Sequence, residues 1–142
     1  MKIVNRFSFL LPIRIPTKTH QEKRIAIAKN GKPKVYEDAE LKDIRSKYEA
    51  HLAKHVPQIP MNGPIELHVV WCFPLQGKHE NGEPKTTKPD TDNMIKLFKD
   101  CMTKTGYWKD DAQVFREINE KFYSNVEGVF VQATEYEKAQ IQ

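Results

Sequence analysis

Apolar residues recur along this chain in two rhythms, strand-like and helix-like, and they mark the first three elements. Ile3–Leu11 mixes β-branched, aromatic and polar residues and ends at Pro12, which predicts a strand. Asp38–Val56 carries apolar residues at helical spacing and stops at Pro57, which predicts a helix. Ile65–Phe73 is almost wholly apolar, with prolines on either side, and predicts a second strand.

The second half of the chain continues with a helix and two strands. From Thr91 to about Lys104, apolar residues fall on one helical face, and Gly106 is placed to end that helix. Val114–Tyr123 and Gly128–Tyr136 predict two strands joined by a turn. The predicted order β-α-β-α-β-β is typical of an α+β fold in which two helices cover one mixed sheet.

Length and composition favour one domain spanning residues 1–142. No apolar run approaches the roughly 18 residues that a membrane helix needs. The run Phe7–Leu11 is too short for a signal peptide, so we expect a cytoplasmic protein without a membrane partner. Two cysteines and no C-x-x-C pair exclude a disulfide framework and a cysteine-based zinc site.

Two polar stretches separate the predicted elements. After Pro12 come about 25 residues rich in Pro, Lys, Gly and Thr, and a structureless segment of that length in a small domain is usually functional. Residues 14–34 hold seven Lys or Arg against one acid, which indicates a polyanionic partner or, equally, a solvated loop. The second polar stretch is Leu75–Pro89. The candidate phosphate-contacting residues are Arg14, Lys18, Lys23, Arg24, Lys85 and Lys88.

The candidate chemistry lies in two groups of aspartates. Asp90 and Asp92 stand at the start of the second helix, and the pair Asp110–Asp111 follows that helix. Helix capping accounts for one of the first two acids, but two neighbouring carboxylates repel each other unless a cation or a helix N-terminus relieves them. Mg²⁺ binds oxygen ligands, commonly one or two carboxylates, and assists phosphodiester hydrolysis. The aspartates therefore predict a magnesium site.

Two further residue types have alternative interpretations. Lys96 lies one helical turn after Asp92, where an ion pair with Asp92 or Asp100 is its plainest role and neutralisation of a phosphate its catalytic one. The aromatic pair Tyr107–Trp108 suits either packing in the core or stacking on opened DNA bases. The spacing favours the ion pair and the core.

These residues also resemble a known family. The run Asp90-Thr91-Asp92-Asn93 with Lys96, followed by Gly106–Val114, is similar to the D-x-D-N-x-x-K and aromatic-W-x-D-D-x-Q-V motifs of the RusA family of Holliday junction resolvases. The resemblance implies that Asp90, Asp92 and Asp111 bind the metal, with Asp110 adjacent and supporting. It also implies that Lys96 is catalytic. The segment Leu11–Lys18 departs from the family's usual opening, which leaves DNA contacts there open.

The same resemblance implies a RusA-like fold and a Mg²⁺-dependent endodeoxyribonuclease, with Mn²⁺ as a substitute. Its substrate would be a four-way DNA junction in recombination and repair. Metal-activated water would attack a phosphodiester and leave 5′-phosphate and 3′-hydroxyl ends. A homodimer would place two nicks symmetrically in a roughly two-fold substrate. The short form of the family is common in prophages.

Two other functions compete with this one. A nuclease of the restriction-enzyme type would need an acid-x-Lys element, where this chain reads Asp111-Ala112-Gln113. A module that binds branched or duplex DNA without cutting it would not need the acidic set. The chain between Thr105 and Asp111 can only just lead back to Asp90, so Asp111 serves either its own site or the partner subunit's.

Overall fold

A computed structural model describes residues 1–16, 23–27, 31, 33–37 and 39–139. Their elements follow the order β-β-β-α-β-α-β-β, with one short 3-10 turn before β5. The bounds are β1 (Ile3–Leu11), β2 (Lys23–Ile27), β3 (Pro33–Glu37), α1 (Ala39–Leu52), β4 (Ile65–Pro74), α2 (Thr91–Thr105), η1 (Asp111–Gln113), β5 (Val114–Ser124) and β6 (Gly128–Tyr136).

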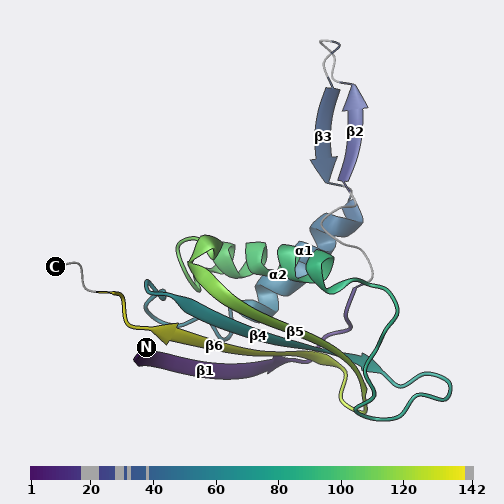
Figure 1. Cartoon of the computed structure of the whole chain (residues 1–142). Coiled ribbons are helices and arrows are strands. Elements are labelled where there is room, and N and C mark those ends of the chain that lie inside the picture. The colour runs from purple at the N-terminus through teal and green to yellow at the C-terminus, as the bar shows by residue number, and fades with distance from the viewer. Residues whose placement is uncertain (17–22, 28–30, 32, 38, 140–142) are drawn as a thin grey trace.

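The main sheet has four strands in the order β1-β6-β4-β5, and only the β4–β5 pair is parallel. Figure 1 shows α1 and α2 on one face of this sheet, with the opposite face uncovered. The predicted α+β fold, one mixed sheet covered by two helices, is confirmed.

The core fills the space between the helices and the sheet. Residues of β4 alternate strictly between buried and half-buried, as expected for a strand with one covered face. The Trp71 ring packs edge-on against Phe98 of α2, with ring centroids 5.4 Å apart. Phe98 also meets Tyr48 of α1 at 5.1 Å, so one aromatic cluster joins both helices to the sheet. This packing fixes the position of α2.

The end of α2 is built as the sequence predicts. Gly106 adopts a left-handed conformation with φ 100°, which glycine reaches without the steric penalty of a Cβ atom. Tyr107 and Trp108 follow and are almost wholly buried, which confirms their place in the core. The Tyr107 hydroxyl donates to the Leu52 carbonyl at 2.6 Å and therefore ties this turn to α1.

The segment before α1 corrects one prediction. We expected no element between Pro12 and the first helix, but β2 and β3 pair as an antiparallel hairpin. Each strand has only five residues and lies in a polar, basic segment, which obscures the strand pattern in the sequence. Figure 1 shows the hairpin projecting away from the main sheet. Within the described ranges, no helix is long and apolar enough to cross a membrane.

Candidate active site

Asp90 directly precedes α2, Asp92 lies in its first turn, and both are exposed. Asp90 is the N-cap residue, with φ −76° and ψ 145°, yet its side chain makes no capping hydrogen bond. Its backbone carbonyl instead accepts the amide of Met94 at 3.2 Å. Helix capping therefore does not occupy the Asp90 carboxylate, which remains available to a ligand beside the positive end of the helix dipole.

The turn before Asp90 is fastened to β5. Lys121 reaches from the strand and donates its ammonium to the carbonyls of Thr87, at 2.7 Å, and Pro89, at 2.8 Å. Pro89 itself is buried, and the bond between Lys88 and Pro89 is cis. The backbone that carries Asp90 into α2 is thus held by a side chain 32 residues further along the chain.

Lys85 supports the same loop. Its backbone amide donates to the Lys121 carbonyl at 2.9 Å, so the loop follows the outer edge of β5. The Lys85 ammonium donates to the Thr87 hydroxyl at 2.7 Å and lies 5.1 Å from the ring centroids of both Phe73 and Tyr123. The predicted phosphate contact of Lys85 stays a prediction, and it would compete with these internal contacts.

Asp110 and Asp111 lie at the opposite end of α2. They line a shallow groove with residues at the C-terminal end of that helix, among them Thr103 and Lys104. With 15 residues at 1.5 Å each, α2 is about 22 Å long, and Asp90 lies at the other end of it from Asp110 and Asp111. Among the described residues, no group of three or more Asp, Glu, His or Cys could hold a metal ion. One chain therefore does not bring Asp90, Asp92 and Asp111 together.

The two acids of this pair have different surroundings. Asp110 caps η1, because its carboxylate accepts the Ala112 amide at 2.9 Å. Gln113 completes the turn: its side-chain oxygen accepts the amides of Lys109 and Asp110, and its nitrogen donates to the carbonyls of the 61–63 segment. For the half-buried Asp111, the described part of the chain offers no hydrogen bond or ion pair to its carboxylate. Asp111 is the member of the pair whose carboxylate is available.

Lys96 is exposed on α2, one turn after Asp92. Its neighbours on the helix are engaged elsewhere, since Lys99 pairs with Glu117 at 2.9 Å and Asp100 with Arg45 at 3.7 Å. No ion pair of Lys96 with Asp92 or Asp100 occurs in the described residues. The intrahelical ion pair that its spacing favours is therefore not formed, and the catalytic role stays a prediction.

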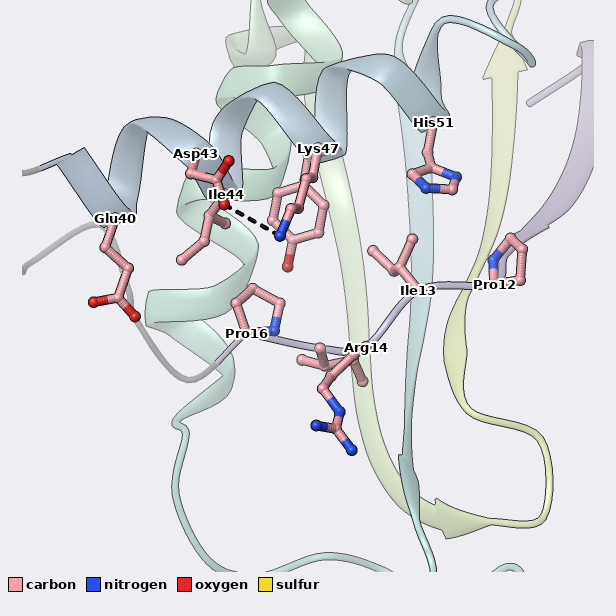
Figure 2. A pocket seen from close by; sticks show the side chains of 11 residues that line it. Pro12, Ile13, Arg14, Pro16, Glu40, Asp43, Ile44, Lys47 and His51 are labelled. Atoms are coloured by element: carbon pink, nitrogen blue, oxygen red, sulfur yellow. Dashed lines mark ion pairs between the residues drawn. The ribbon is translucent and has the colours of Figure 1, made fainter.

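The other predicted DNA contacts are scattered. Arg14 pairs with Glu127 at 3.5 Å, and Lys88 is exposed. Lys18 lies outside the described residues, and Lys23 and Arg24 are described only as positions on β2. Figure 2 shows the groove beside α1 in which Arg14 lies. Its lining mixes both charges with apolar residues and includes an ion pair between Asp43 and Lys47, so it is not a uniformly basic surface.

Comparison with known proteins identifies the family. The family model of endodeoxyribonuclease RusA matches residues 16–134, which is most of the chain. The chain belongs to the RusA family. It is 34% identical over 103 residues to the crossover junction endodeoxyribonuclease rusA of Lactococcus phage r1t, covering 71% of this chain and 76% of that protein. It is 31% identical over 107 residues to the uncharacterized protein YqaN of Bacillus subtilis (strain 168), covering 68% and 75%.

The RusA-family match includes both ends of α2 and the two motifs there. Two residues of this site escaped the sequence analysis as functional candidates. Gln113 belongs to the second motif, but its spacing gives no sign that it braces the Asp110–Asp111 turn. Lys121 has no local signal at all, because its partners lie in a loop before α2. Gln113 holds the backbone beside Asp110 and Asp111, and Lys121 holds the backbone before Asp90.

Proposed function

We propose that this chain is a Mg²⁺-dependent endonuclease that resolves four-way DNA junctions by paired symmetric nicks, in recombination and repair. The observation that carries the proposal is the state of Asp90 and Asp92, two exposed carboxylates at a helix start with no capping hydrogen bond from Asp90. Family membership and the name of the phage relative, a crossover junction endodeoxyribonuclease, support the choice of a junction as substrate. That relative also favours an origin in a prophage.

The donors at this site suit a hard cation. Asp90 and Asp92 offer carboxylate oxygens only, and Mg²⁺ typically takes one or two carboxylates with waters and substrate phosphates. Mn²⁺ accepts the same oxygen ligands and is expected to substitute. When bound, such an ion orients and activates water and stabilises the negative charge that develops on the phosphate. The chain's own contribution is to hold the two carboxylates at the end of a rigid helix.

The third carboxylate comes from a second copy of the chain. Asp111 lies at the far end of a helix about 22 Å long, and the described residues of one protomer bring no three candidate metal ligands together. A two-fold axis that sets two α2 helices side by side and antiparallel would bring the Asp90 end of one helix beside the Asp111 end of the other. A homodimer of this kind has two equivalent composite sites, as paired nicking requires.

This arrangement restricts the surface through which the protomers associate. Contact through the uncovered sheet face would leave the α2 helices on opposite outer surfaces, because packed sheets already stand about 10 Å apart. Contact on the β5 side keeps both α2 helices in one layer. Among the described residues, the 82–85 loop covers the outer edge of β5 at its C-terminal end, and Phe115 near the start of β5 is 46% exposed. We therefore assign the dimer contact to the β5 and α2 side.

Lys96 completes the proposed chemistry. Its ammonium is exposed beside Asp92 and, in the described part of the chain, is not engaged by Asp92 or Asp100. A lysine in this position is suited to neutralising the charge of the scissile phosphate in the transition state. Arg14, Lys18, Lys23, Arg24, Lys85 and Lys88 remain the candidates for contacts with the DNA backbone, whose phosphates supply most of the non-specific affinity.

The test compares a labelled synthetic four-way junction with linear duplex of the same sequence, in Mg²⁺ and in Ca²⁺. We expect paired symmetric nicks in the junction, in Mg²⁺ only, and none with Asp92→Asn. Tight junction binding without nicks in any metal would favour a binding-only protein. Equal cutting of the duplex would instead indicate a nuclease of different specificity.

A further inference from the structure

We propose that Lys121 is a positioning residue of the active site, which sets the Asp90 carboxylate by clamping the turn that leads into α2. The inference deepens the proposed function, and it rests on that function for the identity of the ligand. Its basis is a pair of short hydrogen bonds from one ammonium to two carbonyls of the same turn, at 2.7 Å to Thr87 and 2.8 Å to Pro89.

The two hydrogen bonds from Lys121 act on the backbone directly before Asp90. Pro89 directly precedes Asp90, and Asp90 is the N-cap residue of α2. Because a proline carbonyl fixed in space also fixes the peptide plane that follows it, the Lys121 contact determines where the Asp90 Cα atom stands. No capping bond holds the Asp90 side chain. The Asp90 carbonyl is held on the helix side by the Met94 amide, and the Lys121 clamp holds the backbone on the other side of Asp90.

Lys121 is suited to this task by its own placement. It lies in the middle of a strand that is paired with β4 on one side and with the 82–85 loop on the other. The strand is hydrogen-bonded on both sides at Lys121, whereas residues 86–88 are exposed. The Lys121 ammonium is half-buried and donates to two carbonyls, so it is a brace for the turn and not a free cation for phosphate.

Lys85 forms a second layer of the same support. It donates to the Thr87 hydroxyl and stands over the Phe73 and Tyr123 rings, while its own backbone amide is bonded to the Lys121 carbonyl. Lys85 acts on Thr87, three residues from Asp90, whereas the Pro89 carbonyl accepts from Lys121. We therefore expect replacement of Lys121 to have a larger effect on the Asp90 carboxylate than replacement of Lys85.

The experiment uses the full chain with Lys121→Met, which removes both hydrogen bonds and keeps most of the side-chain volume, and Lys42→Met as the control on an exposed face of α1. Two quantities are measured. One is hydrogen–deuterium exchange of the amides in the first turn of α2, where the Met94 amide donates to the Asp90 carbonyl. The other is binding of Mn²⁺ alone, by calorimetric titration. Urea unfolding of each variant shows whether the fold is retained.

With Lys121→Met, we expect faster exchange confined to the first turn of α2, at the Met94 amide above all. We also expect Mn²⁺ binding weaker by about 10–100-fold, the usual loss when a residue that orients a metal ligand is removed. The concentration of Mg²⁺ that gives half-maximal junction cleavage should rise in parallel, while the rate at saturating Mg²⁺ recovers most of the loss. Lys42→Met should change neither quantity. If Lys121→Met folds and binds Mn²⁺ as tightly as the wild type, the positioning role is wrong.

The outcome also separates this inference from the proposed function. Wild-type protein that binds Mn²⁺ but cuts no junction would overturn the proposed activity, and the comparison of Mn²⁺ binding would still decide the role of Lys121. If Lys121→Met fails to fold, Lys121→Arg takes its place, since a longer head group keeps the charge but alters the contacts with both carbonyls. If Lys121→Met misfolds and Lys121→Arg shows unchanged Mn²⁺ binding and unchanged amide exchange, Lys121 has a structural role only.

Discussion

Asp90 and Asp111 stand at opposite ends of α2, each with a carboxylate that local helix capping does not use. The residue before each of them makes a structural hydrogen bond: the Pro89 carbonyl accepts from Lys121, and the Asp110 carboxylate caps η1. Each end of the helix therefore carries aspartates on a backbone that is held in place, but neither end alone has all three aspartates of the expected metal site. Two chains related by a two-fold axis would complete both.

Replacing one carboxylate at the start of α2 should abolish the chemistry without harming the fold. We expect Asp92→Asn to lower the rate of junction cleavage by about 100-fold or more, because a bound ion contributes several kcal/mol to the transition state. Junction binding should be retained or improved, since a negative charge is removed. Gel-shift and cleavage assays measure the two effects. Asp43→Asn on α1 is the matched control, and equal loss of cleavage there would refute the assignment.

Gln113 should matter through the turn that it braces. Gln113→Ala removes bonds to two amides and two carbonyls, so we expect a loss of about 1–3 kcal/mol in the free energy of unfolding. We also expect a higher Mg²⁺ requirement for cleavage, because the Asp110–Asp111 turn loosens. Urea unfolding and a Mg²⁺ titration measure these changes, with exposed Gln58→Ala as the control. An unaltered Mg²⁺ requirement would show that the brace serves stability alone.

Tyr107→Phe tests whether this aromatic residue belongs to the core. The substitution leaves the buried Leu52 carbonyl without the hydroxyl that donates to it at 2.6 Å. We expect the free energy of unfolding to fall by about 1–3 kcal/mol, measured from the urea midpoint. Junction affinity should not change, because the ring stays buried. A large loss of DNA binding with unchanged stability would restore base stacking as its role.

Stability should also fall at high pH. Burial raises the pKa of the Cys101 thiol from 9.0 to about 12, so the unfolded chain loses this proton first. The contribution of the Cys101 thiol to the free energy of unfolding is complete below about pH 9. It is lost as the pH rises toward 12, by up to about 1.4 kcal/mol per pH unit. Burial raises the pKa of Tyr48 and Tyr107 in the same direction. Urea unfolding from pH 8 to 11 should show the decline, and Cys101→Ala should reduce its slope. A constant free energy over this range would contradict the burial argument.

Local patterns in the sequence predicted the main sheet and the helices well. The bounds of β1 and β6 agree with the prediction, as does the helix stop at Gly106, because alternation and glycine conformation are local properties. The hairpin β2–β3 was missed, since strands of five residues are too short to show a clear period. The first helix ends at Leu52, four residues before its predicted end, where a turn leads toward Pro57.

The candidate site was predictable only in its residue types. Asp90, Asp92, Asp110 and Asp111 are visible as acids near a helix, but their separation depends on how far α2 runs before the chain turns into β5. The division of labour between Asp110 and Asp111 depends on cap geometry. The role of Lys121 depends on a contact across 32 residues, which no local pattern encodes.

The most direct test of the account is a mixed dimer. Asp92→Asn and Asp111→Asn chains, each with a different affinity tag, are co-expressed, and the doubly tagged species is assayed on a four-way junction beside each variant alone. If each site takes Asp92 from one protomer and Asp111 from the other, the mixed dimer has one intact site and should nick one strand, while both single variants stay inactive. A mixed dimer that forms but cuts nothing, beside an active wild type, would contradict the shared site.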